Sequence, residues 1–151
     1  MYSYLFNILP EYVFAYYLFT FEQYIIHNIQ HTSEYFASHR LQHHRTYSIN
    51  NITKIIKNNS LFSNVDLYFY GNILVFIVHY FVFNFNILVF QLFLAWLSYH
   101  FHNEYHNPNT KWKNYSFFKY LKRKHCLHHK FPKRNYFLID PTFDFIFRTY
   151  L

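Results

Sequence analysis

The sequence has few of the residues that most folded domains use freely. Of its 151 residues, one is glycine, one is cysteine and only 14% are charged, against about 25% in ordinary soluble domains. The single cysteine, Cys126, excludes an intrachain disulfide framework and therefore a disulfide-stapled secreted module. The apolar composition argues against disorder, and the length indicates a single domain over residues 1–151. Histidine, by contrast, is abundant, with twelve residues.

Lysine and arginine are missing from two long stretches, residues 1–39 and 58–110. All fourteen lie in two blocks, four within residues 40–57 and ten within 111–148. The two stretches without positive charge hold the long apolar runs, and apolar runs separated by basic loops are typical of membrane-embedded segments. No positive residue precedes Arg40, which argues against a cleaved signal peptide.

The apolar runs predict about three membrane-embedded helices. Pro10-Glu11 is a plausible helix start, and a helix from there to about Glu34 would be about 36 Å long, enough to cross a bilayer core of about 30 Å. The second run, residues 65–101, is too long for one crossing, so we expect a hairpin that turns near Asn84–Asn86. This topology puts both basic blocks on one side, as the charge pattern favours.

The segment between the two runs leaves two alternatives open. Ile52, Ile55 and Ile56 have the spacing of one helix face, next to Lys54 and Lys57. A short amphipathic helix at the membrane surface would explain this spacing, and so would a solvated loop that happens to carry isoleucines. On either reading, we expect an all-α, integral membrane helical bundle.

Ten of the twelve histidines fall into four short groups, which read HNIQH, HRLQHH, HNEYH and HCLHH. They are His27, His31, His39, His43, His44, His102, His106, His125, His128 and His129. Residues three or four apart project from one helix face, so each group can direct its imidazoles to one point. Neutral imidazole binds iron, zinc, copper or nickel. Ten ligands exceed the capacity of one ion, so the sequence predicts a di-metal site, which the hairpin topology would place at one membrane face.

This ordered series resembles the fatty acid hydroxylase / sterol desaturase superfamily of membrane di-iron oxygenases. The resemblance covers roughly residues 20–150 and extends to the tail, where DFIFRT, from Asp144 to Thr149, is similar to the D-x-x-F-G-T segment of that family. Glu22, before the first histidine pair, also matches an acid common in the family. Arg148 stands where the family usually has glycine, and the chain has no haem-binding cytochrome domain.

The resemblance implies an enzyme, a lipid-modifying oxidoreductase that uses O2 to hydroxylate or desaturate a fatty acyl, carotenoid or sterol substrate. The ten histidines would hold two iron ions, with zinc able to replace iron in a purified sample. Electrons would come from a separate donor such as a b-type cytochrome and its reductase. The resemblance also implies an integral membrane location, the endoplasmic reticulum in a eukaryotic host, with the histidines on the cytosolic side.

Other readings of the same residues remain open. Cys126 lies inside HCLHH, but one thiol cannot build a Cys2His2 zinc site. His79, in an apolar run, could be a haem ligand, although this leaves the grouped histidines unexplained; His79 and His100 otherwise suit packing or interfacial roles. The basic, aromatic segment 111–134 would also suit single-stranded nucleic acid, but a basic stretch near lipid headgroups accounts for it better, so we expect no nucleic-acid partner. A non-catalytic metal-binding protein or an inactive family member is the remaining alternative.

Overall fold

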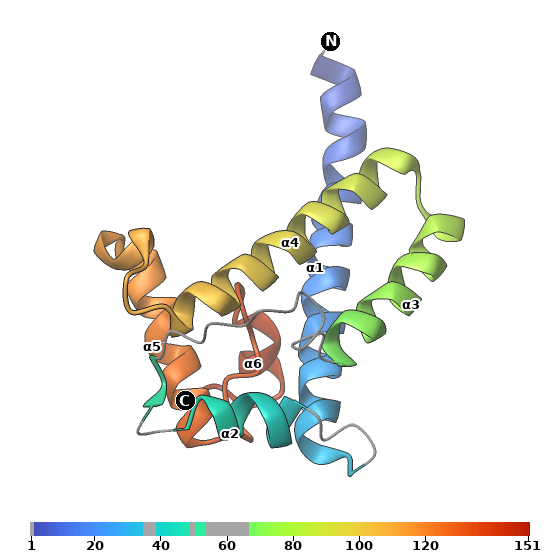
Figure 1. Cartoon of the computed structure of the whole chain (residues 1–151). Coiled ribbons are helices and arrows are strands. Elements are labelled where there is room, and N and C mark those ends of the chain that lie inside the picture. Colours follow the sequence, from blue (N-terminus) through green and yellow to red (C-terminus); the bar gives the residue numbers. More distant parts are fainter. Residues whose placement is uncertain (1, 35–38, 49–50, 54–66) are drawn as a thin grey trace.

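The structure, a computed structural model, describes residues 2–34, 39–48, 51–53 and 67–151, and within these ranges its regular elements are helices alone. This confirms the all-α class. In chain order the elements are α1 (Tyr2–Thr32), a π-helical turn η1 (His39–His43) continuous with α2 (His44–Thr46), α3 (Leu67–Val82), α4 (Phe85–His106), a 3-10 turn η3 (Lys111–Asn114), α5 (Ser116–Lys130) and α6 (Thr142–Ile146) (Figure 1).

The first helix begins earlier than Pro10-Glu11 predicted. α1 starts at Tyr2 and continues through Pro10, which lies inside the helix. Proline lacks a backbone N–H, so within a helix it removes one hydrogen bond, but the neighbouring turns can continue on both sides. Pro10-Glu11 is therefore an internal position of α1 and marks no boundary.

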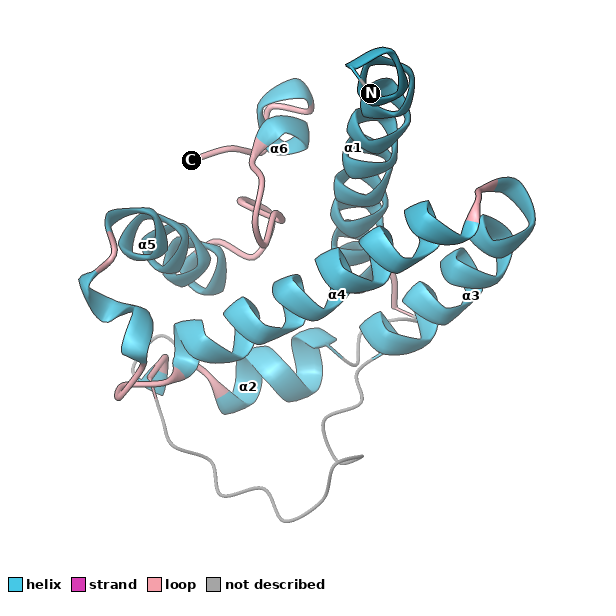
Figure 2. Ribbon diagram, turned by 90° about the horizontal axis from the view of Figure 1, so that it is seen from above, coloured by secondary structure: helices cyan, strands magenta, loops and turns pink. Residues whose placement is uncertain are grey.

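The expected hairpin in the second apolar run is confirmed. α3 ends at Val82 and α4 begins at Phe85, with Asn84 as its N-cap. The Asn84 side chain accepts a hydrogen bond from the backbone N–H of Ile87 at 3.1 Å, which satisfies one of the free donors of the first turn. From this turn α4 crosses α1, against which it packs, and leads towards α5 (Figures 1 and 2).

The membrane-spanning part of the expected fold is wrong. Over the ranges that the structure describes, no helix is both long enough and apolar enough to cross a bilayer. α3 is apolar but has 16 residues, about 24 Å, which is short of the about 30 Å hydrocarbon core. α1 and α4 are longer, but polar residues such as Glu22, His27 and Gln91 interrupt them. The expected helix or loop over 48–64 falls largely on residues outside those described.

The outer surface of the α3–α4 hairpin is apolar. Phe81 and Phe85, beside its turn, are 80% and 74% exposed. Ile77, Tyr80 and Leu92 line a shallow apolar groove between the two helices. This arm of the molecule therefore exposes several large apolar side chains together.

The buried core lies at the other end of α4. Phe101 and Tyr105 of α4 pack there against Phe118 and Leu121 of α5 and against Phe137 of the C-terminal tail. The Tyr105 hydroxyl also donates a hydrogen bond to the backbone carbonyl of Leu138 at 2.7 Å. This core joins the C-terminal end of α4 to the N-terminal half of α5 and to the tail, and five of the ten grouped histidines lie on these two helices.

Candidate metal centre

The grouped histidines come from the C-terminal ends of α1, α4 and α5 and from the short η1–α2 segment between α1 and α3. His27 and His31 lie in the last turns of α1, His106 is the last residue of α4, and α5 ends just after His128-His129. Backbone carbonyls at a helix C-terminus carry partial negative charge, which favours a cation nearby. The convergence of three such ends gives the site an electrostatic preference for positive ions before any side chain is considered.

Five of these histidines form one group, which we call site A. Its members are His27, His31, His39, His44 and His128, and their ligand atoms all lie within 4.8 Å of one another. The Nε2 atom of His128 is 3.0 Å from that of His31 and 3.1 Å from that of His44. The Nε2 atoms of His27 and His39 are 3.1 Å apart.

Four more histidines form a second group, site B. Its members are His43, His106, His125 and His129, which also lie within 4.8 Å of one another by their ligand atoms. The Nε2 atom of His125 is 2.9 Å from that of His106 and 3.0 Å from that of His129. His43 Nε2 is 3.2 Å from His106 Nε2.

The two sites are adjacent. The rings of His44, in site A, and His129, in site B, stack with centroids 4.1 Å apart, and those of His39 and His43 stack at 4.7 Å. His102 belongs to neither group, but its ring lies beside site B, 4.5 Å from His43 and 4.8 Å from His125. The structure thus brings nine of the ten expected ligands into two neighbouring sets, with the tenth next to one of them.

Backbone carbonyls orient three of the ligands. The Nδ1 atom of His27 donates to the carbonyl of Tyr136 at 2.6 Å, and that of His128 donates to the carbonyl of Arg134 at 2.7 Å. In site B, His106 Nδ1 donates to the carbonyl of Ile52 at 2.7 Å. Because a carbonyl can only accept, the proton of each neutral ring lies on Nδ1, and Nε2 presents a lone pair to its neighbours.

Burial keeps these imidazoles neutral. Desolvation lowers the pKa of His27 and of His106 to about 4, and it lowers the pKa of His31, where neighbouring His27 adds to the effect, to about 2. Desolvation also takes the pKa of His128 well below its usual value. Neutral imidazoles can give their nitrogen lone pairs to a metal ion, so these convergent sets have the chemistry of metal sites.

The spacing of the nitrogens also fits a metal. A metal–nitrogen distance of about 2.1 Å separates adjacent ligands by about 3.0 Å at right angles and by about 3.4 Å in a tetrahedron. The Nε2 separations of 2.9–3.2 Å in both sites match the right-angled case. Four ligands in site B leave room for a further ligand on an ion with five or six positions, and five ligands in site A leave room on an ion with six.

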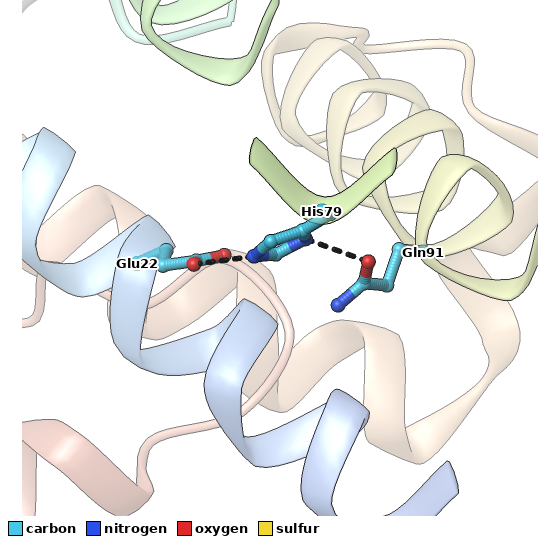
Figure 3. Close-up of polar contacts among 3 residues, drawn as sticks. All are labelled: Glu22, His79 and Gln91. Atoms are coloured by element: carbon cyan, nitrogen blue, oxygen red, sulfur yellow. Dashed lines mark hydrogen bonds and ion pairs between the residues drawn. The ribbon is translucent and has the colours of Figure 1, made fainter. Parts of the chain in front are cut away.

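Two histidines outside the groups have partners of their own. His79 of α3 lies between α1 and α4, where its Nε2 is 2.8 Å from Glu22 Oε1 and its Nδ1 is 2.6 Å from Gln91 Oε1 (Figure 3). Both ring nitrogens are engaged, which argues against the haem alternative. His100 Nε2 accepts a hydrogen bond from the indole of Trp112 at 3.1 Å. Cys126 belongs to neither metal group.

Sequence reasoning missed the groups that support the ligands. The carbonyls of Ile52, Arg134 and Tyr136 carry no signal in the sequence, since every residue has one. Tyr47, whose ring stacks on that of His106 at 3.9 Å, was also missed. Tyr47 follows His44 by three residues, at the end of a basic helical segment, and this position next to the histidine group is the signal that could have indicated its role beside the ligands.

Comparison of the chain with models of known protein families, with curated proteins and with solved structures gave no match.

Proposed function

We propose that this protein is a di-metal oxidoreductase that uses O2 to hydroxylate or desaturate a C–H bond of a lipid chain. The observation that carries the proposal is the presence of two adjacent, buried sets of neutral imidazoles whose Nε2 atoms converge. Two iron ions are the group we propose to bind there. Bound iron would supply the O2-reducing chemistry, with electrons from a separate donor such as a b-type cytochrome and its reductase.

The donor set supports redox chemistry over a purely structural role. Nine imidazoles form the two sites, and no carboxylate or thiolate belongs to either group among the described residues. Neutral donors leave the full positive charge on the bound ions, which favours binding and polarisation of further ligands. A structural zinc site, in contrast, usually closes its tetrahedron with thiolates.

The protein itself would hold, orient and shield the centre. Tyr136, Arg134 and Ile52 fix the proton of three ligand rings on Nδ1, so that Nε2 stays available for metal at neutral pH. His27 and His128 are 1% and 0% exposed, which limits the access of bulk water to site A. Exclusion of water protects reactive species from side reactions, a requirement for attack on an unactivated C–H bond.

Metal content of the purified protein tests the proposal. We expect two irons per chain when the protein is produced with sufficient iron. His128→Ala should remove the ion of site A, and His106→Ala should remove that of site B. Cys126→Ser is the matched control, because this side chain lies on the same helix as His125 and His128 but outside both groups, and it should keep both ions.

The activity needs its own measurement. Expression in a host of known lipid profile should give an oxygen-dependent new hydroxylated or desaturated lipid, which the His106→Ala variant should not produce. Wild-type protein without metal, or variants that keep the wild-type metal content, would refute the di-metal centre. If the protein binds two metal ions but no new lipid forms, the result would indicate a non-catalytic metal-binding protein.

A further inference from the structure

A buried carboxylate outside both metal groups holds the tail that supports site A. Asp144 of α6 is 0% exposed. Its Oδ1 accepts from the backbone N–H of Tyr136 at 2.9 Å and from the hydroxyl of Thr149 at 2.6 Å. Its Oδ2 accepts from the backbone N–H of Phe137 at 2.8 Å. All three donors are neutral, so the carboxylate is held by hydrogen bonds to the chain itself.

The backbone that Asp144 holds is the one that orients two ligands of site A. The backbone N–H of Tyr136 donates a hydrogen bond to Asp144, and the carbonyl of Tyr136 accepts one from His27 Nδ1. Two residues earlier, the carbonyl of Arg134 accepts from His128 Nδ1. Between them Asn135 has a left-handed backbone, with φ of 53°, and its N–H donates to the carbonyl of Thr149 at 3.0 Å. A short, tightly bonded loop thus connects Asp144 to both imidazoles.

Site B has separate support. The ring of His106 is oriented by the carbonyl of Ile52, which lies far from the tail in sequence. A change at Asp144 should therefore act on site A alone. This selectivity separates a positioning role from a general contribution to folding, which would affect both sites together.

We propose that Asp144 is a positioning residue that holds the Arg134 and Tyr136 carbonyls against His128 and His27 and so keeps site A ready for metal. The inference deepens the proposed function, since it assumes that site A binds an ion. Asparagine at position 144 has one acceptor oxygen in place of two, and its NH2 group would face a backbone N–H. One buried donor would lose its partner and the loop would shift.

Titration of metal-free protein with Zn²⁺ tests this inference. Loss of partners around metal ligands typically weakens metal binding by about 10–100-fold, so Asp144→Asn should weaken one of two binding steps by this factor and leave the other unchanged. Asp140→Asn is the matched control. Asp140 lies in the same tail and accepts from Tyr16 Oη and the backbone N–H of Thr142, at 2.8 Å each, but it does not bond to the supporting loop. It should behave as wild type.

The tautomers of the imidazoles give a readout independent of metal. In metal-free protein, nitrogen-15 NMR should find the proton on Nδ1 in His27, His128 and His106. Asp144→Asn should disturb the first two and leave His106 unchanged. If Asp144→Asn does not fold, Thr149→Val, which removes one hydrogen bond to the carboxylate with little change in shape, should give the same pattern more weakly.

Each outcome decides a separate question. Unchanged tautomers and two unchanged binding steps in a folded Asp144→Asn protein would overturn the positioning role while the proposed metal centre stands. Equal weakening of both steps would also overturn it, since that is the effect of a general fold residue. Wild-type protein that binds no metal would refute the proposed function, and the NMR result would still decide the role of Asp144 in orienting the rings.

Discussion

Replacement of Arg148 by glycine should stabilise the protein. Arg148 has φ of 58°, in the left-handed region, where a side chain costs about 1–2 kcal/mol. Glycine removes this cost but makes the unfolded chain more flexible, which offsets about 0.4–1 kcal/mol. The net expected gain is about 0.5–1 kcal/mol. The carbonyl of Arg148, which accepts a hydrogen bond from Arg134 at 2.6 Å, is kept in the variant because it belongs to the backbone.

The assay is thermal and denaturant unfolding of metal-free protein. For a chain of this length, about 1 kcal/mol corresponds to a Tm change of about 2–4 °C, so Arg148→Gly should raise Tm by about 1–4 °C. Arg148→Ala is the matched control, because it removes the same side chain but keeps the Cβ atom that causes the strain. A glycine variant no more stable than the alanine variant would show that the backbone at this position is not strained.

Three further results are expected. His79→Ala should lower the free energy of unfolding by about 1–3 kcal/mol, because it leaves the carboxylate of Glu22 and the amide oxygen of Gln91 without their partner. The metal content of the folded protein should stay at the wild-type level, and a smaller loss in the double variant with Glu22→Gln would confirm the cause. Tyr105→Phe should cost about 1 kcal/mol in the same measurement, through the lost hydrogen bond to Leu138, and no loss would argue against that bond. Metal-free protein should lose stability as pH falls from about 6.5 towards 4. Desolvation lowers the pKa of His27 to about 4, so the unfolded chain binds protons before the folded protein does. Each such histidine contributes a slope of about 1.4 kcal/mol per pH unit to the free energy of unfolding, and denaturant midpoints that do not change across this range would contradict the prediction.

The sequence predicted the helical class and the hairpin because both depend on local patterns. The Asn84 cap follows from the preference of short polar side chains for helix starts. The membrane helices were wrongly predicted, although polar positions such as Glu22 and Gln91 interrupt the apolar runs. Glu22 and Gln91 meet His79 in the folded protein, and such pairing depends on which helices pack together, which a single sequence does not reveal.

The division of the histidines into two sites could not be predicted from their spacing alone. His43 belongs to site B and His44 to site A, and likewise His128 belongs to site A and His129 to site B. Successive residues on a helix point about 100° apart, so each pair of adjacent histidines lies between the two sites and contributes to both.

The exposed apolar arm formed by α3 and α4 has a practical consequence for every measurement proposed above. Large aromatic side chains such as Phe81 and Phe85, exposed together at one end of the molecule, favour self-association in plain buffer. Detergent or another amphiphile that shields this end should keep the protein monodisperse. Samples prepared without one should sediment as aggregates, and their apparent metal stoichiometry would then describe the aggregate.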